Sequence, residues 1–275
     1  MLHIPDETPE IFALSRSTHL GIGAHQDDLE FMAFHGILAC YDSEENWFTG
    51  VTCTDGAGSS RIGKFADFSD ADMIRVRFDE QNAAADLGQY AAQYQLGYPS
   101  SVIKDPKNQE LTYQLAEIIT ATRPHTIYAH QPADKHPSHL GTLHHTLAAL
   151  RSLPAAQHPT TFIGCEVWRD LDWLPDEKKV AMDVSARPEL AEKLNEVFQS
   201  QIAGGKNYHQ AIMGRRSANA TFSNPHATDA ATQIAFGVDL MPLLKHPSLS
   251  LRDFTLNLIE QFKSEVQHAL ASLNS

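Results

Sequence analysis

Short apolar runs alternate with longer amphipathic stretches through the first two-thirds of the 275-residue chain. This alternation is the sequence pattern of repeated βα units, which build a mostly parallel sheet flanked by helices. The sequence therefore predicts an α/β fold. Four runs are expected to be strands: Leu20–Ala24, Phe48–Thr52, Tyr94–Leu96 and Thr126–Ala129. Two later runs are expected to add edge strands: Thr161–Trp168 and Lys179–Asp183.

The stretches between these runs are expected to be helices: Asp28–Cys40, Asp72–Leu87, Gln109–Thr122 and Ser138–Arg151. The pattern changes at Pro188. We expect a helix at Glu189–Gln201, then a Gly-, Asn- and Ser-rich region to about residue 230, then a final amphipathic helix over about residues 251–270. Because no linker is visible, we predict one domain over residues 1–275. Its core would span about residues 18–187, and a C-terminal extension, about 188–275, would cap the active site.

Composition excludes several classes of function. The chain has 34 acidic and 21 basic residues, a formal net charge of -13, so it lacks the basic surface that nucleic acids and anionic membranes require. It contains no apolar stretch long enough to span a bilayer, and its first residues lack the pattern of a signal peptide. Its three cysteines form no CxxC pair, which fits a reducing cytosol. We therefore expect a cytoplasmic protein that acts on a small molecule, and the negative net charge favours a partner that is neutral, cationic or metal-bound.

The first segment whose residues could bind a metal or catalyse a reaction is GIGAHQDDLE, residues 21–30. There an apolar strand leads into a histidine and two aspartates. Open α/β sheets bind their ligands at this carboxyl end of a strand. His25 and Asp28 are three residues apart across the turn, so their side chains can converge on one ion. Asp27 is offset by one residue and is expected to face a water that the ion binds.

A second segment, HQPADKHPSH at residues 130–139, also follows an expected strand and precedes an expected helix. His136 and His139 are three residues apart and can share one face of that helix. The two loops together offer His25, Asp28 and His139. Three protein ligands with an open fourth position are typical of catalytic Zn²⁺, whereas structural zinc sites usually have four ligands that include cysteine.

Such a set suggests a mechanism. Zn²⁺ lowers the pKa of a water that it binds to about 7, and Asp27 can take a proton from that water as general base. Attack on a carbonyl places negative charge on its oxygen, which a protonated His136 can stabilise before it donates a proton to the leaving amine. Asp134 is expected to keep His136 protonated, because a nearby negative charge raises the pKa of a histidine.

These motifs resemble those of the PIG-L/LmbE-like zinc deacetylases. The segment His25–Glu30 is similar to the family's AHPDDxE signature, and His136–His139 is similar to HPDH. Between them, Thr54-Asp55-Gly56, the segment from Arg75 through Glu80 to Gly88, and Leu96–Pro99 also follow the family pattern. The resemblance covers about residues 18–150.

The resemblance implies a Rossmann-like fold and removal of N-acetyl groups from amino sugars. It implies that His25, Asp28 and His139 bind zinc, that Asp27 is the general base, and that His136 stabilises the oxyanion and acts as general acid. It is compatible with a homo-oligomer. Two positions depart from the signatures. Gln26 replaces a proline, and Ser138 replaces the aspartate that orients the neighbouring histidine, a role that Asp134 is a candidate to fill.

Several residues also have a purely structural explanation. An aspartate at a strand end is a favoured helix cap, and Asp55-Gly56 fits a turn as well as a contact with substrate. Isolated arginines such as Arg75 are usually solvated. We keep Asp55, Arg75 and Asp134 as candidates that contact the substrate or support a ligand.

The sequence thus favours a zinc-dependent hydrolase that removes an N-acetyl group from an amino sugar or a related small molecule. The first alternative is a zinc-dependent hydratase or lyase acting on an unsaturated carboxylic acid, as in the 4-oxalomesaconate hydratase branch of the same family. The second is a metal-binding protein without catalytic activity, against which Asp27 argues because a binding site needs no base beside the ion. Another divalent metal remains an alternative to zinc.

Overall fold

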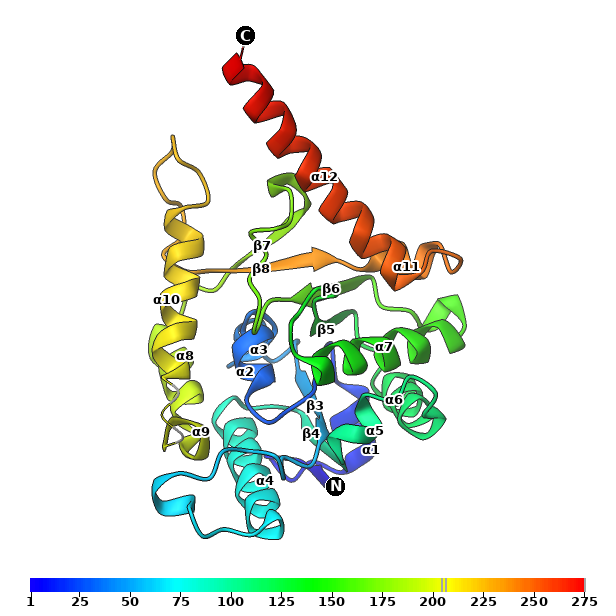
Figure 1. The fold of residues 1–275 in the computed structure, drawn as a ribbon. Helices are drawn as coiled ribbons and strands as arrows, with labels where there is room; N and C mark the ends of the chain where they lie inside the picture. The colour runs from blue at the N-terminus through cyan, green and yellow to red at the C-terminus, as the bar shows by residue number, and fades with distance from the viewer. Residues whose placement is uncertain (204, 206, 275) are drawn as a thin grey trace.

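The computed structural model describes residues 1–203, 205 and 207–274. Within these residues eight strands form one sheet in the order β1-β4-β3-β2-β5-β6-β8-β7 (Figure 1). The strands are β1 (Leu2–His3), β2 (His19–Gly23), β3 (Phe48–Thr54), β4 (Ala92–Tyr98), β5 (Thr126–His130), β6 (Thr161–Cys165), β7 (Lys179–Asp183) and β8 (Ile234–Asp239). The pairs that join β4, β3, β2, β5 and β6 are parallel, and β1, β8 and β7 add antiparallel pairs at the two sides. The predicted mostly parallel α/β sheet is confirmed.

The order of the parallel strands decides where the site lies. From β2 the chain moves outward to β3 and β4, then returns to the other side of β2 to form β5 and β6. This is the strand order of the Rossmann fold, and the carboxyl ends of β2 and β5 meet at its switch point, where a crevice opens. The loops after β2 and β5 are those that carry the two histidine and aspartate motifs.

Helices cover both faces of the sheet (Figure 1). They are α1 (Glu10–Ser15), α2 (Asp28–Met32), α3 (Phe34–Cys40), α4 (Asp70–Leu87), α5 (Ser100–Ile103), α6 (Gln109–Thr122), α7 (Pro137–Ser152), α8 (Pro188–Glu196), α9 (Gln199–Ala203), α10 (Tyr208–Thr221), α11 (Met241–Lys245) and α12 (Leu251–Ala271). Side chains alternate between two hydrophobic cores along a strand. On β5, for example, Ile127 and Ala129 join one core while Tyr128, between them, joins the other.

The structure corrects several expected elements. The helix expected at Asp28–Cys40 is divided at Ala33 into α2 and α3. The run Thr161–Trp168 was expected to lie at an edge, but β6 lies inside the sheet because the unpredicted strand β8 pairs with its outer side. The helix expected at Glu189–Gln201 is divided into α8 and α9.

Helix α10 falls in the Gly-, Asn- and Ser-rich region, where no helix was predicted. Its buried residues are Ile212, Arg216 and Ala220, which are spaced by four and form one face. Arg216 interrupts the apolar pattern, but it is buried because its guanidinium donates to the backbone carbonyls of Glu30 and Phe31. A buried arginine therefore hid this helix from an analysis of hydrophobic periodicity.

The C-terminal extension does not form one cap. Residues of α9 and α10 line the pocket described below. In contrast, β8 extends the sheet, and Phe254 and Leu258 at the start of α12 join the core on the α7 side. The rest of α12 projects from the body of the molecule (Figure 1). No helix within the described residues is long and apolar enough to cross a membrane.

Two helical glycines provide a matched test of packing. A Cβ on Gly141 in α7 would collide with the backbone carbonyl of Ile103, whereas a Cβ on Gly214 in α10 would meet no atom within 4 Å. Alanine has the higher helix propensity, by up to about 1 kcal/mol. We expect Gly214→Ala to stabilise the protein by about 0.5–1 kcal/mol and Gly141→Ala to destabilise it by about 1–3 kcal/mol. Urea unfolding of both variants checks this, and equal effects would contradict the packing argument.

Candidate active site

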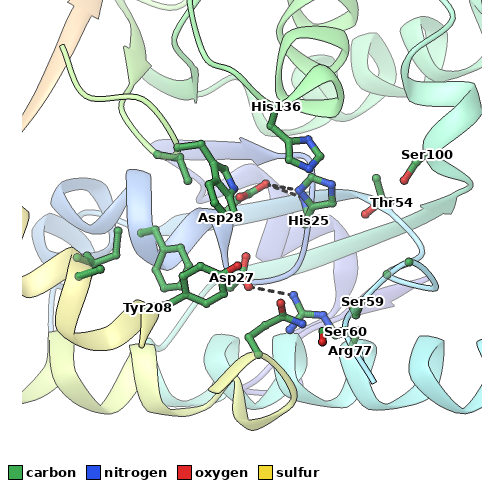
Figure 2. A pocket seen from close by; sticks show the side chains of 18 of the residues that line it. His25, Asp27, Asp28, Thr54, Ser59, Ser60, Arg77, Ser100, His136 and Tyr208 are labelled. Carbon is green, nitrogen blue, oxygen red and sulfur yellow. Dashed lines mark hydrogen bonds and ion pairs between the residues drawn. The ribbon is translucent and has the colours of Figure 1, made fainter. Parts of the chain in front are cut away.

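The loops after β2 and β5 lie side by side. One runs from Ala24 to Asp27 and leads into α2, and the other runs from Gln131 to His136 and leads into α7. They are joined where the backbone N–H of Ala24 donates to Nε2 of His130, at 3.0 Å. The side chains at the ends of both loops therefore face a common space (Figure 2).

The structure brings the three predicted ligands together. Nδ1 of His25 lies 3.2 Å from a carboxylate oxygen of Asp28 and 3.2 Å from Nε2 of His139. Nε2 of His139 in turn lies 3.3 Å from the other carboxylate oxygen of Asp28. Donors about 2.0–2.1 Å from one tetrahedral zinc ion lie about 3.3–3.4 Å from one another. Asp28 and His139 are almost completely buried, at 2% and 0% exposure. The donor types and spacing therefore fit a divalent metal such as zinc.

Two more histidines adjoin this cluster. Ligand atoms of His136 lie within 4.8 Å of those of His25 and His139, and His130 forms an equally close group with Asp28 and His139. His130 is buried and its ring stacks on that of His139 at 3.8 Å. Because Nε2 of His130 already accepts the Ala24 N–H, this residue supports the cluster in the present geometry. Its position as the last residue of β5 was the signal that could have identified it.

Asp134 acts on a different histidine from the one predicted. One of its carboxylate oxygens lies 3.4 Å from Nδ1 of His139 and accepts the backbone N–H of Trp168, and the other accepts the backbone N–H of His136. Burial opposes protonation of His139, but Asp28 and Asp134 outweigh it and raise its pKa. Asp134 therefore orients His139, as a carboxylate often does for a metal-binding histidine.

His136 is correspondingly not held in its charged form. Its Nδ1 accepts the backbone N–H of Ser138 at 3.3 Å, which leaves a hydrogen on Nε2 of the neutral ring. Burial, with the neighbouring His25 and His139, lowers the pKa of His136 to about 4. The structure does not favour the expected protonated His136: the charge of Asp134 raises its pKa, but burial and the neighbouring His25 and His139 outweigh this effect.

Asp27 lies beside the cluster in an unusual conformation. Its φ angle is 92°, in the left-handed region that residues other than glycine rarely adopt. Two side chains of α4 hold it there. Arg77 donates to the Asp27 carboxylate at 3.1 Å and also to the carbonyl of Gln26, and Gln81 accepts the Asp27 backbone N–H at 3.2 Å. Strain of this kind, held by surrounding groups, is often found at functional sites.

The surroundings of Asp27 suit a general base. Burial raises its pKa to about 6, the negative charge of Asp28 adds to this effect, and the positive charge of Arg77 opposes it. For Asp28, burial also opposes ionisation, but His139, His130 and His25 hold its pKa well below the usual range. The adjacent carboxyl groups of Asp27 and Asp28 thus differ in basicity. Asp27, whose pKa is raised, lines the pocket beside the three predicted ligands.

The structure corrects the choice of arginine on α4. Arg75, the sequence candidate, has a side chain that is 72% exposed and pairs with Asp72. Arg77 is 1% exposed, pairs with Asp27 and Glu80, and also donates to the Ser200 hydroxyl. Residues two positions apart point to nearly opposite sides of a helix. The helical spacing of the buried residues of α4 was the signal that could have identified Arg77. These residues are Met73, Arg77, Gln81, Ala84 and Ala85.

Asp55 forms a turn. Its carboxylate accepts the backbone N–H of Ala57 at 3.0 Å, while its neighbours Thr54 and Gly56 line the pocket. Gly56 has a φ of 75°, and a Cβ there would approach the Arg77 side chain closer than 3 Å. The glycine therefore lets Arg77 reach Asp27. The structural explanation fits Asp55, whose side chain closes a turn and is not among those that line the pocket.

The site opens into a cavity of about 470 Å³. Its inner end contains His25, Asp27, Asp28 and His136, with hydroxyl groups nearby such as those of Thr54, Ser59 and Ser100 (Figure 2). The rest of its wall is largely apolar and is lined by side chains from the loop after β6 and from α2 and α10: Phe31, Val167, Trp168, Tyr208, Ile212 and Arg215. This size and division into polar and apolar walls are typical of a site for a small molecule.

Comparisons with known proteins agree with the fold. A model of the PIG-L family, described as GlcNAc-PI de-N-acetylase, matches residues 20–150. The fold is similar to that of the conserved protein TT1542 from Thermus thermophilus, with a TM-score of 0.61 and 20% identity over 85% of this chain and 99% of that one. No curated protein sequence matches the chain.

Two enzymes share the fold at lower identity. The N,N'-diacetylchitobiose deacetylase from Pyrococcus horikoshii has a TM-score of 0.64 and 16% identity, with 84% of this chain and 86% of that one covered. GalB, the 4-carboxy-2-hydroxymuconate hydratase from Pseudomonas putida KT2440, has a TM-score of 0.61 and 13% identity, with 82% and 96% covered. At these identities the likeness establishes the fold.

Proposed function

Because residues 20–150 of this chain form a domain of the PIG-L family, we propose that the protein is a metal-dependent hydrolase that removes the N-acetyl group from an amino sugar or a related small molecule. The observation that carries the proposal is the convergence of His25, Asp28 and His139, with nitrogen and oxygen atoms 3.2–3.3 Å apart, beside a carboxylate that faces the same pocket.

In this proposal His25, Asp28 and His139 hold a zinc ion. Zinc bound there would polarise the amide carbonyl and lower the pKa of a water at the open position to about 7. Asp134 contacts Nδ1 of His139 and so orients the ring with Nε2 toward Asp28 and His25. The four side chains come from the two loops at the switch point of the sheet and from the first turns of α2 and α7 that follow them.

Asp27 is the proposed general base. Its raised pKa, about 6, lets the carboxylate accept a proton from the attacking water near neutral pH. Arg77 and Gln81 hold this carboxylate in place, so that little reorganisation is needed during the reaction. The protonated Asp27 can then return the proton to the leaving amine.

His136 is the proposed hydrogen-bond donor to the oxyanion. With Nδ1 accepting the Ser138 N–H, Nε2 carries the hydrogen and can donate it without a positive charge on the ring. We also propose that residues 1–275 act as one domain, in which α9 and α10 complete the pocket built by the loops of the core.

The test measures amine release and metal content together. Purified protein is expected to contain one zinc per chain by elemental analysis and to release primary amine and acetate from at least one N-acetylated sugar in a panel. Removal of the metal with a chelator should abolish this activity, and added Zn²⁺ should restore it.

The hydratase alternative rests on the fold shared with GalB. It predicts no acetate from any sugar in the panel, together with loss of absorbance from 4-carboxy-2-hydroxymuconate. That pair of results would replace the hydrolase proposal, and metal content without either reaction would favour the binding protein.

A further inference from the structure

The large apolar side chains that α12 exposes form a stripe along one side of the helix. They are 38–79% exposed and comprise Leu256, Ile259, Val266, Leu270 and Leu273, the last in the short helical turn Ser272–Asn274 that directly follows α12. Lys263 divides the gap between Ile259 and Val266, so the six positions follow one another in steps of three, four, three, four and three residues. This is the spacing of the a and d positions of a heptad repeat, by which two helices pack along their length.

The stripe faces away from the body of the molecule. Phe254 and Leu258, near the start of α12, belong to the hydrophobic core, and farther along the helix Gln261 and His268 border an open hollow with Glu177. Because each residue turns a helix by about 100°, Gln261 and His268 lie on the side opposite the stripe. The part of α12 that projects from the body therefore holds the stripe toward solvent (Figure 1).

A second copy of the same helix fits this stripe when the two helices run in opposite directions. The series of steps is the same in both directions along the chain, so a two-fold axis midway between residues 263 and 266 relates two stripes position by position. Every position of one helix then faces a position of the other, and each contact occurs twice. The pairs are Leu256 with Leu273, Ile259 with Leu270, and Lys263 with Val266.

Lys263 favours this antiparallel arrangement over a parallel one. In a parallel pair equivalent positions meet, and the two Lys263 ammonium groups would lie in the same layer of the interface. In the antiparallel pair the stem of Lys263 packs against Val266 of the second copy and its Nζ reaches the rim, where it lies 2.9 Å from a carboxylate oxygen of Glu260 on its own helix. Residues 256–273 carry one lysine and two glutamates, so the stripe is nearly neutral although the whole chain has a net charge of -13. Two copies can therefore meet along α12 with less repulsion than over the rest of their surface.

We propose that α12 binds α12 of a second copy as an antiparallel pair and that the protein is thereby a homodimer. The paired segment, residues 256–273, is about 26 Å long at a rise of 1.5 Å per residue. It is shorter than the three to four heptads that are typical of a coiled coil, so we expect a reversible dimer with a dissociation constant of about 1 µM. No residue of α12 is among those that line the described pocket. The inference therefore goes beyond the proposed function and does not depend on it.

Charge substitutions at one facing pair test both the contact and its direction. Analytical ultracentrifugation of the full chain at about 0.1–100 µM should show a monomer–dimer equilibrium for the wild type. Ile259→Lys and Leu270→Glu should each raise the dissociation constant at least about 10-fold, because each places a charge against an apolar side chain. In the antiparallel pair the double variant brings each new lysine to a new glutamate, so it should dimerise at least about 10-fold more tightly than either single variant. The control Ala271→Glu adds the same charge one residue outside the stripe and should dimerise like the wild type.

The existence of the contact and its direction are decided separately. A wild type that stays monomeric up to about 100 µM, or a dimer that Leu270→Glu leaves as tight as the wild type, overturns the inference. A double variant that is no tighter than the single variants overturns the antiparallel direction, since a parallel pair would bring like charges together. Thermal melting followed by circular dichroism should show that all variants are folded. If Ile259→Lys or Leu270→Glu is unfolded, Leu256→Lys and Leu273→Glu repeat the test at the ends of the stripe.

Discussion

Replacing Asp27 with asparagine is expected to lower kcat by about 100- to 10,000-fold, the usual contribution of a general base, while each chain still binds one metal ion. Asparagine has nearly the same shape, tolerates the left-handed φ of 92°, and can still accept a hydrogen bond from Arg77. The fold and the three ligands should therefore be preserved. What is lost is the ability to accept a proton.

Two comparisons make this result specific. His139→Ala removes a ligand and should lose metal and activity together, because its Nε2 lies in the close set of donor atoms. Asp55→Asn alters the same kind of side chain in a turn outside the pocket and should leave kcat within about twofold. Steady-state kinetics and elemental analysis of the three variants separate these outcomes. Full activity in Asp27→Asn would contradict the general-base assignment.

The second large effect concerns stability. Arg77→Met is expected to destabilise the protein by about 3–5 kcal/mol, because it leaves the buried carboxylate of Asp27 and the partly buried carboxylate of Glu80 without their counterion. Arg75→Met, two residues earlier on α4, removes an exposed ion pair and should cost no more than about 1 kcal/mol. Urea unfolding of the two variants measures both values, and similar losses would show that the buried network contributes little.

The pH dependence of the Arg77→Met loss has a definite sign. Without the guanidinium, burial and the Asp28 charge still raise the pKa of Asp27 in the folded state, above its value in the unfolded chain. A raised pKa favours the folded state when the group is protonated, and this contribution is lost as pH rises through the folded pKa. The deficit of the variant should therefore be smaller at pH 5 than at pH 8.

The sequence was sufficient to locate the two motifs and to predict that they meet. Strands separated by helices form parallel βα units, whose carboxyl ends lie at one edge of the sheet. Two loops 106 residues apart are therefore predicted to lie together. His25, Asp28 and His139 follow from this rule, since each stands just after a strand and just before or within the first turn of a helix.

The tertiary structure decided which polar group meets which. Hydrophobic periodicity identifies the apolar residues that turn inward, but a buried polar residue is stable only with partners that come from elsewhere in the chain. Arg77 rather than Arg75 supports Asp27, and Asp134 orients His139 rather than His136. Arg216 is buried through carbonyls 185 and 186 residues away, which concealed α10 and the pocket wall that it forms. These pairings depend on three-dimensional distance, and spacing along the chain carries no record of them.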